Sequence, residues 1–392
     1  MSARTTPSGG RTLVARLDSD GDVLLAGPAV RAVARGSDHV TLLVSPSGEQ
    51  AATLLPGVDE VLVWSCPWSG FEPPPVDADD VQRLVESLRD RRIDQAVVMT
   101  SYHQSALPLA LLLRLAGVGT VVASSEDYPG SLLDVRHPPG GPHEVQRGLS
   151  LVAAAGFTST DDGRLALRRP LPAAPPELHS WAEPLDGFVA VHATASVPAR
   201  APSPEHVARL VTALRRAGHA VVLSGTAADQ PVTRRVAELS QRGLASGGLP
   251  GPTGGTRHTE KRKRTTKPAP LLDLAGRTSF AQLAAVLERA TCLVSGNTGP
   301  AHLAAAVGTP VVSLFAPVVS AEAWRPWAVP SIVLGDQGAP CAGSRARVCP
   351  VPGHPCLDGI APDDVVSAVD ELLVHAPSPE RARLDLVEGV SA

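Results

Sequence analysis

Aromatic residues are scarce in this chain, which has 5 Trp, 2 Tyr and 5 Phe among 392 residues. Hydrophobic residues nevertheless make up 43% of the sequence. Its cores must therefore be built mainly from Ala, Val and Leu rather than from aromatic side chains. The chain is too long for one typical core, so we expect about two domains.

Long apolar runs and a set of paired cysteines are also lacking. No stretch approaches the roughly 20 apolar residues of a membrane span. The first ten residues are polar and lack the apolar region of a signal peptide, so we expect a cytoplasmic protein. Five cysteines are too few, and odd in number, to indicate a disulfide framework. The net charge of -4 argues against a general nucleic-acid binder.

Strand-like and helix-like segments alternate along the chain, which predicts parallel sheets covered by helices on both faces. The expected strands are 11–17, 40–44, 58–64, 95–99, 120–123, 188–192, 220–224, 292–294 and 310–315. The expected helices are 23–34, 79–89 (capped by Asp79 or Asp80), 105–115, 144–155, 204–216, 229–242, 280–289, 300–306 and 362–374.

A Pro-rich stretch at 168–187 interrupts this alternation. We therefore predict two Rossmann-like domains, 1–170 and 188–375, joined by a linker at 171–187 and followed by a tail at 376–392. Ligands of such sheets bind outside the C-terminal strand ends, so we expect loops of both domains to face a cleft.

Residues 243–270 differ from the rest of the chain because they are rich in Gly, Pro and Thr and carry a basic run. This composition predicts a flexible, exposed insertion in the second domain. The basic run is either a docking site for an anionic partner, such as a membrane surface or a polyanion, or simply a solvated loop.

The first candidate site follows the first expected strand, in the segment from Arg16 to Asp22. Asp22 falls at a helix N-terminus, where a carboxylate either caps the helix or acts as a general base for an incoming hydroxyl. Together with Asp18 and Asp20 it also raises the alternative of a hard-cation site. The glycines of this turn do not form a GxGxxG pattern, so a nicotinamide dinucleotide fingerprint is absent.

Polar side chains also follow two strands of the second domain. Hydroxyls of Thr194 and Ser196 and nearby backbone N–H groups suit phosphate oxygens, and Arg200 suits bidentate pairing with a diphosphate. The alternative is a polar loop with a solvated arginine. Asp229 is a candidate acceptor of ribose hydroxyl protons, or else a helix cap.

The segment from Asn297 to His302 runs from a strand into an Ala-rich helix. Pro300 suits the first helical turn, where its missing N–H has no partner. A Thr298-Gly299 loop at a helix N-terminus is typical of an anion site, since free N–H groups and the positive dipole end face the ligand. His302 lies near enough to donate to a phosphate oxygen, or is a packed, satisfied histidine.

Three cysteines, Cys341, Cys349 and Cys356, cluster with His354 near the C-terminus. A zinc site is one interpretation. Their spacing matches no common zinc pattern and contains no CxxC pair, so we predict no metal site.

Together these segments resemble glycosyltransferase family 9, the heptosyltransferase-like enzymes. The matching motifs are Arg16-x-Asp18-x-x-Gly21-Asp22, His143-Glu144-Val145, His192-Ala193-Thr194, the run from Asn297 through Thr298-Gly299-Pro300-Ala301-His302 to Val312, and Pro340-Cys341, Cys349-Pro350 and Cys356-Leu357. The resemblance covers most of the chain and implies the α/β GT-B fold, with two Rossmann-like domains facing a cleft.

The resemblance also implies an activity. It is the inverting, metal-independent transfer of a sugar, heptose or related, from a nucleotide-diphosphate donor, expected to be ADP-linked, to a hydroxyl of a glycan or lipid-linked acceptor. The resemblance implies no separate cofactor and no nucleic-acid partner. It implies a peripheral contact of the protein with the inner face of the cytoplasmic membrane. Asp22 would deprotonate the acceptor, while the Thr298-Gly299 helix N-terminus and Arg200 stabilise the leaving diphosphate. The donor site would comprise Thr194, Ser196, Arg200, Asp229, Asn297, Thr298, Gly299 and His302.

Four departures from the family pattern leave alternatives open, one of which is the unusual insertion at 243–270. The family usually has Asp at the position of Asn297, where the carboxylate often reaches the donor sugar. Ala201-Pro202-Ser203 replace a basic and aromatic stretch, and Ser344 replaces a cysteine. The alternatives are a different donor sugar, a small-molecule acceptor, a divergent or non-catalytic sugar-nucleotide binder, or an epimerase sharing the GT-B fold.

Overall fold

A computed structural model describes residues 9–70, 72–101, 104–138, 141–246 and 267–375. The chain divides into two compact units. The first comprises residues 1–171 together with Glu322–Ala328, and the second comprises residues 172–321 and 329–392. Each unit contains one six-stranded parallel sheet.

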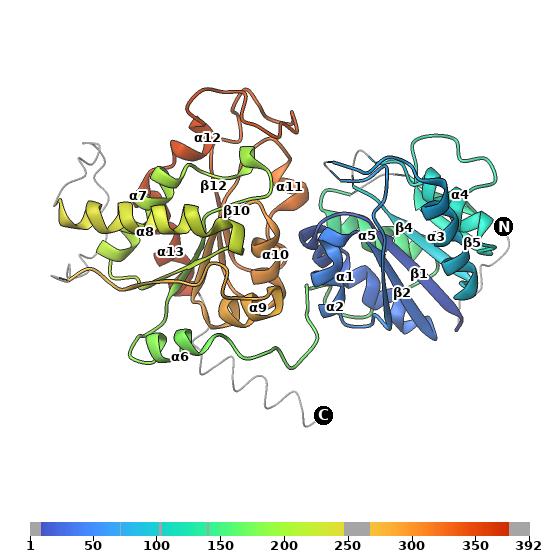
Figure 1. Ribbon diagram of the computed structural model, residues 1–392, viewed down its shortest axis with the longest axis horizontal. Helices are drawn as coiled ribbons and strands as arrows, with labels where there is room; N and C mark the ends of the chain where they lie inside the picture. The colour runs from blue at the N-terminus through green and yellow to red at the C-terminus, as the bar shows by residue number, and fades with distance from the viewer. Residues whose placement is uncertain (1–8, 71, 102–103, 139–140, 247–266, 376–392) are drawn as a thin grey trace. The chain divides into compact units, whose positions relative to one another are not determined.

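The first unit alternates strands and helices from the N-terminus onward (Figure 1). Its strands are β1 (Arg11–Arg16), β2 (His39–Val44), β3 (Glu60–Val63), β4 (Gln95–Met99), β5 (Thr120–Ser124) and β6 (Val135–His137). Its helices are α1 (Asp20–Arg35), the 3-10 turn η1 (Pro46–Gly48), α2 (Glu49–Leu54), α3 (Ala78–Asp90), α4 (Leu107–Leu115) and α5 (Glu144–Ala154).

The second unit repeats this plan with additional short helices. Its strands are β7 (Val189–His192), β8 (Val221–Ser224), β9 (Leu271–Asp273), β10 (Cys292–Gly296), β11 (Val311–Leu314) and β12 (Ser331–Leu334). Its helices and 3-10 turns are α6 (Pro176–Ala182), η2 (Pro198–Arg200), α7 (Pro204–Arg216), η3 (Ala227–Asp229), α8 (Gln230–Ala245), α9 (Phe280–Arg289), α10 (Gly299–Ala306), α12 (Pro355–Asp358) and α13 (Pro362–His375). The short α11 (Ala321–Trp324) begins at the boundary between the units.

The order of strands is the same in both sheets. It is β3-β2-β1-β4-β5-β6 in the first and β9-β8-β7-β10-β11-β12 in the second. The chain therefore reverses direction across the sheet between β1 and β4, and again between β7 and β10. Ligands of doubly wound sheets bind outside the carboxyl ends of the strands at such switch points.

Small aliphatic side chains fill both cores, as the scarcity of aromatic residues predicts. On one face of the first sheet, Leu13 and Ala15 of β1 pack with Leu88 of α3 and Leu113 of α4. In the second unit, side chains of α7, α8 and α13 pack with those of β7, β10 and β11. Among the described residues, no helix combines the length and apolarity that a bilayer span requires.

Most expected elements form, but several local predictions were wrong. Helix α3 is capped by Asp77, whose carboxylate accepts from the backbone N–H groups of Asp79 and Asp80, so neither of those two is the cap. The linker at 171–187 contains α6, which begins at a proline and buries Leu178. The insertion at 243–270 begins within α8, because the helix continues to Ala245. Its residues 247–266, and the tail at 376–392, lie outside the described residues.

Candidate active site

The first candidate site surrounds Arg16, the last residue of β1, at the switch point of the first sheet. Its guanidinium is buried and contacts three carboxylates. The Nε atom lies 2.8 Å from Asp18 Oδ2, Nη2 donates to Asp22 Oδ1 at 3.1 Å, and both Nη atoms donate to Glu144 Oε2 at 3.2 Å. The planar guanidinium therefore fixes these carboxylates relative to one another.

The protonation of this cluster follows from its burial and its charges. Burial alone would lower the pKa of Arg16, but Asp18, Asp22 and Glu144 together raise it well above its usual range. Burial raises the pKa of Asp18, opposed by Arg16 and by a hydrogen bond from Gln104 Nε2 at 2.8 Å. Arg16 is thus a permanent cation.

Asp22 is the most accessible carboxylate around Arg16. Its side chain is 22% exposed, compared with 9% for Asp18 and 4% for Glu144. Asp22 lies in the first turn of α1, and its Oδ2 atom accepts a hydrogen bond from Ser19 Oγ at 2.9 Å. The N-cap residue of α1 is Ser19, so the interpretation of Asp22 as the helix cap was wrong.

Asp20 has a different environment although it shares this turn. Its Oδ1 atom accepts a hydrogen bond from the backbone N–H of Ala51 at 2.8 Å. Burial raises the pKa of Asp20 to about 6, partly offset by that hydrogen bond. Asp20 therefore attaches α1 to α2, whereas Asp22 is oriented by Arg16 and Ser19.

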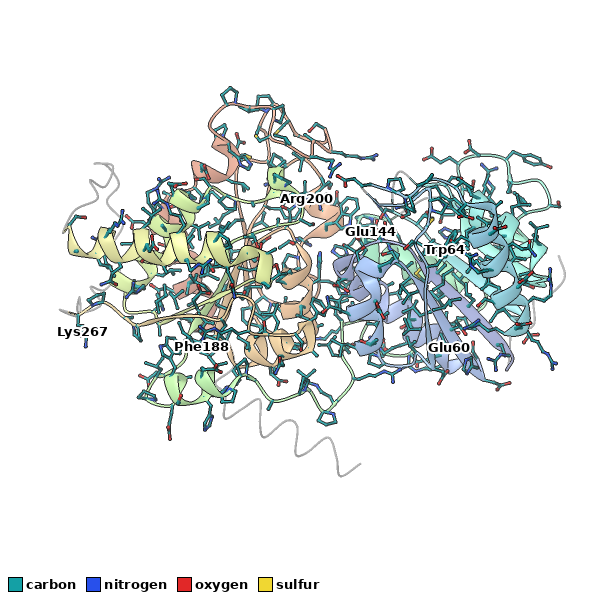
Figure 2. All side chains as sticks on the ribbon, in the orientation of Figure 1. Glu60, Trp64, Glu144, Phe188, Arg200 and Lys267 are labelled. Carbon is teal, nitrogen blue, oxygen red and sulfur yellow. The ribbon has the colours of Figure 1, made fainter. Side chains whose placement is uncertain are left out.

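Glu144 begins α5 and is labelled in Figure 2. Its Oε1 atom accepts a hydrogen bond from Arg147 Nη1 at 2.7 Å, one helical turn further along. The preceding residue, His143, caps α5 by accepting from the backbone N–H of Val145 at Nδ1. Its other ring nitrogen therefore carries the proton and donates to the carbonyl oxygen of Arg325 at 2.9 Å.

Residues 322–328 complete the first unit around this helix terminus. The Trp327 ring lies against the His143 ring with centroids 4.4 Å apart, and Trp327 Nε1 donates to the carbonyl oxygen of Gly163 at 2.9 Å. The sequence analysis did not predict this packing, because no local pattern connects residues so far apart in the chain.

The second candidate site lies at the switch point of the second sheet, where β7 and β10 end. A Cβ atom on Gly296, the last residue of β10, would lie 2.5 Å from the carbonyl oxygen of Arg200. Glycine at this position allows η2 and its Arg200 (labelled in Figure 2) to lie directly against the end of β10.

The anion-site segment begins immediately after β10. Thr298 is the N-cap of α10, its side chain forms no capping bond, and Gly299 and Pro300 start the helix as expected. Asn297 is 6% exposed, and its Oδ1 atom accepts from the backbone N–H of Ala316 at 3.3 Å. Its Nδ2 atom is buried and has no hydrogen-bond partner in the described structure. His302 is also 6% exposed and lies within α10.

The carboxyl ends of β7 and β8 lie side by side, since His192 and Ser224 are paired in the sheet. His192 Nδ1 lies 3.1 Å from Ser224 Oγ, and His192 Nε2 lies 3.4 Å from Thr194 Oγ1. Burial lowers the pKa of His192 to about 4, so the ring is neutral near pH 7. Ser196, in the same loop, is exposed.

Asp229 closes a capping box with Thr226. Both the backbone N–H and the hydroxyl of Thr226 donate to Asp229 Oδ2 at 2.7 Å. The N-cap of the turn η3 is Thr226, with Asp229 as its partner. Asp229 is the N-cap of α8 by position, but its side chain forms no capping bond there, so the interpretation as a helix cap holds for its position alone. Ribose binding by its other carboxylate oxygen stays a prediction.

The cysteines are free thiols. Cys341 and Cys356 lie in the core of the second unit, with Cys349 packed against it. Burial raises the pKa of the Cys356 thiol to about 11, reinforced by the two neighbouring thiols. Among the described residues, no group of three or more His, Cys, Asp or Glu side chains is placed to hold a metal ion.

The model of glycosyltransferase family 9 (heptosyltransferase) matches residues 81–354. The chain belongs to this family. It is a glycosyltransferase, and the expected GT-B fold is confirmed by solved family 9 structures that share it.

The relatives of this family 9 chain include lipopolysaccharide heptosyltransferase 3 of Escherichia coli strain K12, which is 27% identical over 77% of this chain and 81% of the relative. Among solved structures, a glycosyl transferase family 9 protein from Veillonella parvula has a TM-score of 0.69 at 16% identity, covering 95% of this chain and 99% of that one. The ADP-heptose lps heptosyltransferase II of E. coli has a TM-score of 0.63 at 20% identity, covering 93% and 99%.

The structure therefore groups the expected site residues into two sets, one at each switch point. Asp22 lies in the first, with Arg16 and Asp18. The expected donor-site residues all lie in the second unit. Sequence reasoning missed Ser101, because its contact with Arg16 joins residues 85 positions apart. It also missed Arg147, although the i,i+3 spacing from Glu144 on one helix is a local signal.

Proposed function

We propose that this family 9 glycosyltransferase moves a heptose or related sugar from an ADP-linked donor to a hydroxyl of a glycan or glycolipid acceptor. We further propose that the transfer inverts the anomeric carbon and needs no metal ion. The names of the E. coli relatives support an ADP-heptose donor and a role in lipopolysaccharide biosynthesis. The cytoplasm, at the membrane face where a lipid-linked acceptor is available, is the proposed location.

The observation that carries the proposal is the environment of Asp22. It is the most exposed of the three carboxylates on Arg16, and it is held by hydrogen bonds from Arg16 and Ser19. A general base must be reachable by the acceptor and fixed in direction, and Asp22 meets both requirements. It would take the proton as the acceptor oxygen attacks the anomeric carbon.

The second unit would stabilise the leaving group. As the bond from the anomeric carbon to the diphosphate breaks, its electron pair goes to the diphosphate oxygen. The N-terminus of α10, at Thr298 and Gly299, presents backbone N–H groups and the positive end of the helix dipole. Arg200, positioned against Gly296, would supply a cation. These groups would carry the charge that a metal ion carries in other transferases.

Donor binding tests the proposal without knowledge of the acceptor. Calorimetry of the full chain with ADP, GDP and UDP should show binding of ADP, and failure of all three nucleotides to bind the folded protein contradicts the proposal. A donor library with a mass-spectrometric readout then identifies the sugar. NMR of the product's anomeric proton tests inversion, and the rate in EDTA tests metal independence.

Binding without turnover is the result that favours the alternative. If ADP binds but no donor in the library is consumed with any acceptor, the chain is a sugar-nucleotide-binding relative rather than an active transferase.

A further inference from the structure

The segment 322–328 belongs to the first unit, although in the chain it lies between β11 and β12 of the second sheet. Two contacts join it to the N-terminal end of α5. His143, which is 2% exposed, donates from Nε2 to the carbonyl oxygen of Arg325 at 2.9 Å. The Trp327 ring lies against the His143 ring, with centroids 4.4 Å apart. A segment remote in sequence thus fixes where α5 begins.

The orientation of both rings is determined by further hydrogen bonds. Trp327 Nε1 donates to the carbonyl oxygen of Gly163 at 2.9 Å, which attaches the indole to the first unit. Burial lowers the pKa of His143 below its usual value, so the ring is neutral near pH 7. Its Nδ1 atom accepts from the backbone N–H of Val145 at 3.2 Å. With one ring nitrogen accepting and the other donating, the imidazole has a single orientation.

The residue after His143 connects this packing to the proposed base. Glu144 is 6% exposed, and its Oε2 atom accepts from Nη1 and Nη2 of Arg16, both at 3.2 Å. Arg16 Nη2 also donates to Asp22 Oδ1 at 3.1 Å. A shift of the start of α5 would move the Glu144 carboxylate, and the buried guanidinium would follow the charge that compensates it. Asp22 would then lose the donor that orients it.

We infer that His143 and Trp327 are positioning residues of the transfer. They hold Asp22 in its productive direction through the side chains of Glu144 and Arg16. The inference rests on the proposed function, because it names further residues that serve the same base. Neither ring is a catalytic group, since each acts on Asp22 through other side chains. A misplacement of about 1 Å at a reacting group costs about 100-fold in rate, so packing at a distance from Asp22 bears on kcat.

Trp327→Ala tests the inference by steady-state kinetics, with the donor and acceptor found to support turnover. We expect kcat to fall about 10-fold, while KM for the donor and the affinity for ADP stay within about twofold. Trp327→Phe keeps an aromatic ring against His143 and should restore kcat to within about threefold of the wild type.

Trp181→Ala is the matched control. It removes another half-buried Trp, which packs edge-to-face on Phe188 in the second unit with centroids 6.1 Å apart. This variant should leave kcat unchanged. Equal losses of kcat in Trp181→Ala and Trp327→Ala would show a general effect of removing an indole and would overturn the inference.

His143→Asn separates the cap of α5 from the contact with the segment 322–328. Asparagine is a favoured N-cap residue, so its side-chain oxygen replaces Nδ1 as the acceptor for the first turn. It has no ring to pack against Trp327 and no atom at the position of Nε2. We expect the same loss of kcat, about 10-fold, with KM for the donor unchanged. A wild-type kcat would assign the whole role of His143 to the cap and would overturn the inference.

A double-mutant cycle with Glu144→Gln distinguishes positioning from a loss of stability. Glu144→Gln weakens the contact with Arg16, so the path from Trp327 to Asp22 is already interrupted in that variant. Adding Trp327→Ala should then lower kcat by less than about twofold further. Two effects that multiply in full would be independent of each other and would contradict the inference.

A spectroscopic readout tests the same path without turnover. The buried guanidinium of Arg16 should give slowly exchanging side-chain N–H signals in ¹⁵N NMR spectra of the full chain, assigned by their loss in Arg16→Lys. Trp327→Ala should shift or broaden these signals, and Trp181→Ala should leave them unchanged. Unmoved signals in Trp327→Ala overturn the inference, whatever the activity. If the signals move but the chain binds no nucleotide, the connection from Trp327 to Arg16 stands and the proposed function is overturned.

Discussion

The Nη2 atom of Arg16 lies 3.1 Å from Asp22 Oδ1, and the same atom lies 3.2 Å from Glu144 Oε2. One buried cation thus connects a carboxylate of the first turn of α1 to a carboxylate of α5. Removing such a cation leaves buried carboxylates uncompensated, which typically costs about 3–5 kcal/mol. Arg16 therefore both stabilises the first unit and orients the proposed base.

Arg16→Lys should separate these two roles. Lysine keeps the positive charge but lacks the planar fork that contacts Asp18, Asp22 and Glu144 together. We expect kcat to fall about 100-fold because Asp22 loses its orientation, with little change in ADP affinity. Steady-state kinetics and calorimetry measure the two effects. Arg31→Lys, at the separate ion pair with Asp161, is the matched control. Equal loss in both variants would show a general effect on folding.

Asn297→Asp should change donor selection. Asn297 Oδ1 accepts from the backbone N–H of Ala316, and the amide nitrogen has no hydrogen-bond partner among the described residues. Aspartate replaces that donor with an acceptor that pairs strongly with sugar hydroxyls. We expect the ratio of kcat/KM for ADP-heptose to that for ADP-glucose to rise about 10-fold, with a smaller change in ADP affinity. An unchanged ratio would place Asn297 away from the donor sugar.

Gly296→Ala should displace Arg200. The added Cβ would lie 2.5 Å from the Arg200 carbonyl oxygen, which is backbone and cannot rotate away. We expect ADP affinity to fall about 10-fold and the free energy of unfolding to drop by about 1–3 kcal/mol. Gly338→Ala, where the added Cβ meets only the Asp336 carboxylate at 3.4 Å, is the control. Isothermal calorimetry and urea unfolding provide both readouts, and wild-type ADP affinity in Gly296→Ala would contradict the assigned role.

Acid should weaken the second unit through His206. This histidine is 1% exposed, and burial together with the charge of Arg209 lowers its pKa from 6.5 to about 4. Between those values the unfolded chain binds more protons, so the free energy of unfolding falls as the pH drops from about 6.5 to about 4. The loss is on the order of 3 kcal/mol. His192 acts in the same direction.

In the first unit, Asp20 changes the free energy of unfolding in the opposite direction as the pH falls. Its pKa is raised from 3.8 to about 6, so protonation of Asp20 favours the folded form as the pH falls through that range.

Hydrogen exchange of α7 peptides at pH 7 and pH 4.5 measures the stability of the second unit separately from that of the first. His206→Gln should flatten the pH dependence there, and an unchanged slope would assign the effect to other groups.

Local patterns predicted the longer elements well, because each carries its own periodicity or cap. Helices Pro204–Arg216 and Phe280–Arg289 form over the expected residues. Strands β6, β9 and β12 were missed because each has only three or four residues and none is fully buried. Competing caps were also hard to resolve, since Asp77, Asp79 and Asp80 are all acceptable residues at a helix N-terminus.

The candidate site was predicted only as separate segments. A strand followed by a turn and a helix is a local signal, which is why Asp22 and the Thr298-Gly299 loop are identifiable from sequence. The contact between Arg16 and Glu144 joins residues 128 positions apart, so only the folded chain reveals it. A cavity in the first unit, lined by serine and threonine hydroxyls, is likewise assembled from several strands and cannot be identified from any one of them.

The account's central claim is that Asp22 is the base of the transfer, and a comparison of two isosteric variants tests it most directly. Asp22→Asn should lower kcat at least about 1000-fold while ADP binds as in the wild type, because an amide cannot accept the acceptor's proton. Asp20→Asn, in the same helical turn but bound to the backbone of Ala51, should retain activity within a few-fold. Substantial turnover by Asp22→Asn, or equal losses in the two variants, would contradict the account.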